Sequence, residues 1–146
     1  MNRRIPTNLR NKIKDRAGYI CEYCLIHEED AFFGCEVDHI ISQKHGGSSE
    51  IDNLAYTCPF CNRNKGSDIG SISSKTDNFC RFFNPRKDLW AKHFQLIDEQ
   101  IQSLTEIGEV TARILQFNAL ERLLERQELI SEGRYPPDAA QPFITN

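Results

Sequence analysis

The chain has 146 residues, of which 39% are apolar and 27% are charged, a composition typical of about one folded domain. This composition excludes a disordered tail, a fibrous repeat and an integral membrane protein, because no stretch approaches the ~20 apolar residues of a spanning helix. The net charge of −3 argues against a uniformly basic nucleic-acid-binding domain. Basic blocks at residues 1–20 and 58–92 nevertheless flank an acidic block at 21–57, which leaves room for one positive face toward a polyanion.

The N-terminus has basic residues with no apolar run behind them, unlike a secretory signal. We therefore expect a cytoplasmic protein, in which six cysteines indicate metal binding or buried thiols and not a disulfide framework. Residues 7–17 predict a short helix, because Thr7 can cap it, Leu9 and Ile13 share one face, and Gly18 can end it.

The middle of the chain predicts short strands and loops. Two β-rich segments, 35–41 and 54–57, lie on either side of a loop rich in glycine and serine at 42–49. A helix of one or two turns is expected next, ending at Gly66. The polar residues that follow predict a loop over 67–78.

The last third of the chain predicts a hairpin over 93–104 and a helix over 109–117. Asn118 and Glu121 resemble a capping box at the start of a second helix. That helix carries a stripe at helical spacing, which we interpret as core packing; its members are Leu120, Leu123, Leu124, Gln127 and Ile130.

Four cysteines form two Cys-x-x-Cys pairs, the spacing of zinc knuckles: Cys21, Cys24, Cys58 and Cys61. Tetrahedral Zn²⁺ takes thiolate ligands at roughly 2.3 Å, and a two-residue gap lets both thiolates of a pair reach one ion. A closed four-thiolate site leaves no open position, so the predicted zinc is structural. Four buried free cysteines are the alternative.

Residue types that phosphodiester hydrolysis requires lie between and beside these pairs. The reaction needs a base for water, a cation on the phosphate oxygens and groups that orient both. Asp38, His39, Asn53 and Asn62 supply those types. Neighbouring residues of a strand point to opposite faces, so Asp38 and His39 serve a metal and a water separately only if the strand bends. The spacing alone does not prove that the four side chains converge.

Several segments occur in the order and spacing of a known motif: Cys21-Glu22-Tyr23-Cys24, Val37-Asp38-His39-Ile40-Ile41, Gly46-Gly47, Asp52-Asn53-Leu54 and Cys58-x-x-Cys61-Asn62-x-x-Lys65-Gly66. In these segments, residues 17–66 resemble the HNH endonuclease family. The resemblance implies an α+β fold with a ββα-metal (His-Me finger) core, stapled by a four-cysteine zinc site. We expect this core in residues 1–83. The tail resembles that of small bacterial members in Asn84-Pro85-Arg86, Trp90-x-x-His93-Phe94 and Leu104-Thr105-x-Ile107-Gly108. A helical C-terminal extension over 84–146 is therefore expected to pack on the core.

The resemblance also implies a metal-dependent DNA endonuclease. His39 would be the general base, and Asn53 would hold the loop and orient the His39 imidazole. Asp38 and Asn62 would ligate the catalytic ion. Because these two ligands offer oxygen atoms, we expect Mg²⁺ or Mn²⁺ at this position in preference to Zn²⁺.

DNA is the expected partner, with no membrane. Arg63 and Lys65 are candidate phosphate contacts, with solvated helix charges as the alternative. Two other functions stay open: a catalytically silent zinc-knuckle module that binds nucleic acid or protein, and a nuclease subunit that needs a separate protein. A silent copy has no chemical reason to keep His39, Asn53 and Asn62 together, which favours the enzyme.

Overall fold

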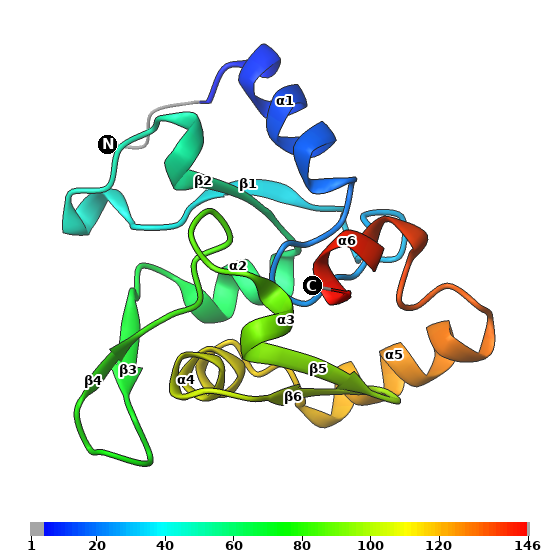
Figure 1. Cartoon of the computed structure of the whole chain (residues 1–146). Helices are drawn as coiled ribbons and strands as arrows, with labels where there is room; N and C mark the ends of the chain where they lie inside the picture. The colour runs from blue at the N-terminus through cyan, green and yellow to red at the C-terminus, as the bar shows by residue number, and fades with distance from the viewer. Residues whose placement is uncertain (1–4, 146) are drawn as a thin grey trace.

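The structure, a computed structural model, describes residues 5–145. Helices and strands are mixed in this part of the chain, and its named strands form three separate antiparallel pairs (Figure 1). The N-terminal segment behind the localisation expectation falls partly on residues 1–4, outside the described residues. Among the described helices, none is long and apolar enough to cross a bilayer.

The segment between the cysteine pairs forms two strands, and a helix follows directly. β1 (Glu36–His39) pairs antiparallel with β2 (Leu54–Thr57), with His39 opposite Leu54 in the register. α2 (Pro59–Lys65) begins with a proline, which the first helical turn accepts because its N–H would be unpaired there. Both strands lie within the two segments predicted for them, and the helix ends at Gly66 as expected.

The first helix, α1 (Thr7–Ala17), lies over this strand pair (Figure 1). It buries Ile13 and ends at Gly18, whose φ of 68° is the left-handed conformation that glycine adopts freely. The predicted helix is thus confirmed at both ends. The side-chain cap expected from Thr7 is wrong, because Pro6 holds the cap position and no side chain caps the helix.

Two short 3₁₀ turns, Gln43–His45 and Ile51–Asn53, shape the loop between β1 and β2. After α2, a second strand pair joins β3 (Gly70–Ile72) to β4 (Phe79–Arg81). The loop expected over 67–78 is therefore wrong at β3. This strand forms through backbone pairing and not through an apolar face that a sequence pattern would reveal.

The hairpin expected over 93–104 is present as the third strand pair. The chain after β4 forms α3 (Trp90–His93), β5 (Phe94–Ile97), β6 (Gln100–Ser103), α4 (Glu106–Ile114), α5 (Leu120–Ser131), a 3₁₀ turn (Asp138–Ala140) and α6 (Gln141–Ile144). α4 begins three residues before the expected helix, because the Thr105 hydroxyl accepts the Gly108 N–H and caps it there.

α5 turns a different face to the core than its sequence pattern predicted. The buried residues of this helix are Arg122, Arg126 and Leu129. Four members of the expected core stripe are exposed, namely Leu120 (70%), Leu124 (55%), Ile130 (37%) and Gln127, while Leu123 is half-buried. The core-packing interpretation is wrong for the four exposed members, because both arginines have buried hydrogen-bond acceptors that only the folded chain supplies.

The capping box expected at the start of α5 is also wrong. Ala119 occupies the cap position, and no side chain caps the helix. The Asn118 side chain is used elsewhere: it accepts the backbone N–H of Ile101 and donates to the Ile101 carbonyl, at 3.0 and 2.9 Å. Asn118 thus joins the start of α5 to β6.

One hydrophobic core runs from the first cysteine pair into the C-terminal region. The Trp90 indole N–H donates to the Tyr23 carbonyl at 2.9 Å, and the Tyr135 hydroxyl donates to the Cys24 carbonyl at 2.7 Å. Backbone carbonyls of the first knuckle are therefore satisfied by side chains that lie far along the chain. The C-terminal region packs directly on the segment that carries the cysteines.

Candidate functional site

The four cysteines of the two pairs meet in one buried cluster. The sulfur atoms of Cys21, Cys24, Cys58 and Cys61 all lie within 4.8 Å of one another, and all six cysteines of the chain are free thiols. The Sγ atoms of Cys24 and Cys58 are 3.7 Å apart. A tetrahedral zinc ion with Zn–S bonds of about 2.3 Å requires sulfur atoms about 3.8 Å apart, so the donor set fits zinc.

Backbone geometry holds each pair in the shape that a shared ion needs. The Cys24 N–H donates to Cys21 Sγ at 3.5 Å, and the Cys61 N–H donates to Cys58 Sγ at 3.4 Å. The second of these bonds is also the N-terminal cap of α2. Leu25, with a φ of 70°, turns the chain back after the first pair. The metal-binding prediction for the cysteines therefore agrees with the local backbone.

The neighbours of the Cys24 sulfur favour its ionised form. Burial alone disfavours its thiolate, but hydrogen bonds from the other three cysteines and the charge of Arg122 lower the pKa of Cys24 below its ordinary value. The guanidinium of Arg122 comes from α5, and the sequence reasoning did not identify it. No local pattern marks it, because the sulfur atoms it touches are at least 61 residues away.

His39 is the last residue of β1 and is half-buried. Its Nε2 lies 2.9 Å from the hydroxyl oxygen of Ser49, in the loop that leads to β2. Gln43 donates to the same hydroxyl at 3.4 Å. The ring orientation of His39 is therefore set by this loop. Ser49 is a contact that the sequence reasoning missed, and a serine in a polar loop carries no signal that would identify it.

Asp38 precedes His39 and forms an ion pair across the site. The Lys65 ammonium lies 3.1 Å from Asp38 Oδ2 and donates to the His39 carbonyl at 2.8 Å. The Lys65 side chain is only 2% exposed, whereas that of Asp38 is 19% exposed. The ammonium expected to contact phosphate thus points inward, and one oxygen of the Asp38 carboxylate is engaged by it.

Asn62 lies on α2 and is also in contact with β1. Its Nδ2 donates to Glu36 Oε1 at 2.7 Å. Glu36 and Asp38 are two positions apart on β1, so their side chains leave the same face of the strand. The carboxylates of Glu36 and Asp38 therefore lie on the face of β1 that contacts Asn62 and Lys65 of α2. The alternation of strand side chains was the signal that could have identified Glu36.

The Asn53 side chain bonds to the loop backbone, and among the described hydrogen bonds none joins it to the His39 imidazole. Its Oδ1 accepts the Ile41 N–H at 2.9 Å, and its Nδ2 donates to the carbonyls of Ile41 and Ser48 at 3.0 and 2.7 Å. Gly47 completes the arrangement, since a Cβ there would lie 1.7 Å from the Ile41 carbonyl oxygen. Asn53 reaches His39 indirectly by two routes: its side chain holds Ser48, the neighbour of Ser49, and its backbone carbonyl accepts the N–H of Ile40, the neighbour of His39.

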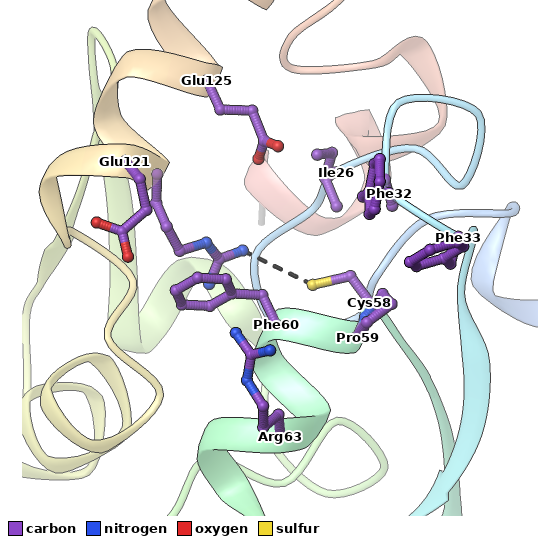
Figure 2. Close-up of a pocket in the computed structure, with 11 residues that line it drawn as sticks. Ile26, Phe32, Phe33, Cys58, Pro59, Phe60, Arg63, Glu121 and Glu125 are labelled. Carbon is purple, nitrogen blue, oxygen red and sulfur yellow. Dashed lines mark hydrogen bonds between the residues drawn. The ribbon is translucent and has the colours of Figure 1, made fainter.

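Arg63, the other expected phosphate contact, is exposed on α2. Its guanidinium carbon lies 5.4 Å from the centre of the Phe60 ring. Figure 2 shows both side chains beside a cavity of about 390 Å³, which is also lined by the exposed Phe32 and Phe33. The cavity adjoins the cysteine cluster through Cys58, and neither Asp38 nor His39 lines it.

Comparison with known proteins adds one match. Residues 21–68 match the family model described as HNH endonuclease. This confirms the resemblance inferred from the motifs, over a stretch that includes both cysteine pairs, β1, β2 and α2. The match indicates a nuclease-type function. Neither the curated proteins nor the solved structures gave a significant match to this chain.

Proposed function

We propose that this chain is a metal-dependent endonuclease that hydrolyses phosphodiester bonds in DNA. In this proposal β1, β2 and α2 form a ββα-metal core within residues 1–83, and residues 84–146 form an extension packed on it. The observation that carries the proposal is the position of Lys65. Its buried ammonium bonds both the Asp38 carboxylate and the His39 carbonyl, so the helix that carries Asn62 is held against the end of β1.

His39 is the proposed general base. When the Ser49 hydroxyl accepts a hydrogen bond from the Nε2–H of His39, the other ring nitrogen, Nδ1, keeps a free lone pair. Nδ1 of His39 is then the atom that takes the proton from the attacking water. Asn53 acts at one remove: its three bonds fix the loop that carries Ser49. This assigns Asn53 as a positioning residue for the base.

Asp38 and Asn62 are the proposed ligands of the catalytic ion. One carboxylate oxygen of Asp38 is held by Lys65, and the Nδ2 of Asn62 is held by Glu36. The Glu36 carboxylate can only accept hydrogen bonds, so it faces the NH₂ group of Asn62. The amide oxygen of Asn62 therefore points away from Glu36. Such an oxygen donor set suits Mg²⁺ or Mn²⁺. Either ion would supply charge stabilisation for the phosphate and its leaving oxygen.

The two basic residues of α2, Lys65 and Arg63, have different roles in this proposal. Lys65 positions Asp38, because its ammonium is buried and already bonded. Arg63 is exposed and beside no carboxylate partner among the described ion pairs, so it is the better candidate for a phosphate contact. DNA is thus expected to approach α2 from the side of Arg63.

A plasmid-cleavage assay with the zinc-loaded protein tests the proposal. Supercoiled DNA is incubated with Mg²⁺, Mn²⁺ or added Zn²⁺, and the product ends are mapped. We expect cleavage with Mg²⁺ or Mn²⁺, weaker cleavage with added Zn²⁺, and 5′-phosphate ends. Inert protein with every ion and DNA form would instead support a silent binding module. Cleavage that appears only with a co-purifying protein would identify a partner-dependent subunit.

A further inference from the structure

An arginine from the C-terminal region reaches the cysteine cluster. Arg122 of α5 donates from Nη2 to Cys24 Sγ at 2.9 Å and from Nη1 to Cys61 Sγ at 3.4 Å. Nη2 also lies 3.7 Å from Cys58 Sγ, the bond drawn as a dashed line in Figure 2. Three of the four sulfur atoms are therefore in contact with one guanidinium. The arginine side chain adds a second layer around the predicted zinc site.

The charge of Arg122 contacts the sulfur atoms directly, whereas the Glu125 carboxylate acts on it only from beyond ion-pair distance. The residue is 3% exposed, and its guanidinium carbon lies 4.4 Å from the centre of the Phe60 ring. Among the described residues, no carboxylate lies within ion-pair distance of it. A buried charge needs a partner. The thiolates are the anions that this position supplies.

We propose that Arg122 is an outer-shell partner of the zinc site, which retains the metal and docks α5 on the two knuckles. One zinc ion with four thiolates carries two excess negative charges, which are costly in a buried site. The guanidinium offsets one of them and donates hydrogen bonds to ligand sulfur atoms, as outer-shell groups do at metal sites. The proposal depends on the zinc prediction and not on the catalytic roles.

Arg126, one turn later on α5, supplies a matched control. It is also buried, at 1% exposure, but it touches no sulfur. Its Nε donates to the Glu99 carbonyl and its Nη2 to the Phe117 carbonyl, both at 2.6 Å. Arg126 thus joins α5 to the turn of the β5–β6 hairpin and to the segment between α4 and α5 through backbone acceptors. A substitution at Arg126 therefore weakens the packing of α5 without removing a contact to sulfur, whereas a substitution at Arg122 removes that contact.

The test measures zinc release to a colorimetric chelator from the zinc-loaded full chain, without DNA. We expect Arg122→Met to release zinc at least about tenfold faster than wild type, because a charge-assisted hydrogen bond to ligand sulfur is lost. Arg122→Lys should be intermediate, since an ammonium cannot bridge three sulfur atoms as a planar guanidinium does. Arg126→Lys should stay within about twofold of wild type. Equal release from folded Arg122→Met and wild type would overturn the proposal, as would equally fast release from Arg126→Lys.

Cobalt substitution gives a second readout for the case in which Arg122→Met does not fold. In the Co²⁺ form of Arg122→Lys, we expect a shift of the thiolate-to-metal absorption band relative to wild type, because sulfur atoms lose N–H donors. An unchanged band together with an unchanged release rate would contradict a role for Arg122 at the metal. Neither measurement depends on DNA cleavage, so an inactive nuclease would leave this inference standing.

Discussion

The ammonium of Lys65 lies 3.1 Å from the Oδ2 atom of Asp38 and is almost fully buried. The same ammonium also donates a hydrogen bond to the carbonyl of His39, the last residue of β1. One residue of α2 is thereby bonded to both residues of the Asp-His pair. This contact ties the proposed base, His39, and the proposed metal ligand Asp38 to the same residue of α2.

Removal of the Lys65 charge should destabilise the protein. Lys65→Met keeps most of the side-chain volume but leaves the Asp38 carboxylate without its partner. Breaking a buried pair in this way costs about 3–5 kcal/mol, and the 19% exposure of Asp38 places the expected loss below that range, at about 2–3 kcal/mol. Urea unfolding measures the loss directly.

Lys44→Met is the matched control, because Lys44 lies exposed in the loop between β1 and β2. Its unfolding midpoint should equal that of wild type, as surface substitutions usually change stability by less than about 0.5 kcal/mol. Equal midpoints for Lys65→Met and Lys44→Met would show that the ion pair contributes nothing to stability.

Asn53→Ala should weaken the loop and slow cleavage together. The substitution leaves the N–H and carbonyl of Ile41 and the carbonyl of Ser48 without their side-chain partner, at an expected loss of about 1–3 kcal/mol. Cleavage should slow because Ser49 no longer holds the His39 ring. The measurements are urea unfolding and single-turnover cleavage at a temperature where the variant is folded. A destabilised variant with the wild-type rate would remove Asn53 from the positioning role.

Zinc removal should unfold the site and release α5 from it. Binding energy at structural zinc sites is folding energy, so the chelated protein should lose its cooperative thermal transition. Metal analysis should find one zinc ion per wild-type chain and none in Cys61→Ser. Cys80→Ser is the control, because Cys80 is buried outside the cluster and its sulfur donates to the Arg81 carbonyl at 3.6 Å. A chelated protein as stable as the zinc form would contradict the structural role.

The elements nearest the site were predictable because their signals are local. The Cys-x-x-Cys spacing predicted a cluster that the structure forms, and Gly18 and Gly66 predicted where α1 and α2 end. Such features depend on a few consecutive residues. Turn geometry and ligand spacing act within that range.

Contacts between distant segments were not predictable from one sequence. Hydrophobic periodicity assigned Leu120 and Leu124 to the core. In the structure α5 instead buries Arg122, because its guanidinium finds hydrogen-bond acceptors in the sulfur atoms of the cysteine cluster. Asn118 likewise has the type of a cap residue and instead pairs with Ile101 on β6. In both cases a buried polar partner overrides local preference. The partner is known only once the chain has folded.

The central claim, that His39 is the base of a DNA-cleaving site, is tested most directly by two histidine variants. Single-turnover cleavage of a supercoiled plasmid with Mg²⁺ is compared for wild type, His39→Ala and His45→Ala, all zinc-loaded and folded. His45 is exposed in the same loop region and is the control. We predict a loss of about 10²–10⁴-fold for His39→Ala, the usual contribution of a general base, and a rate near wild type for His45→Ala. Equal rates for wild type and His39→Ala would contradict the account.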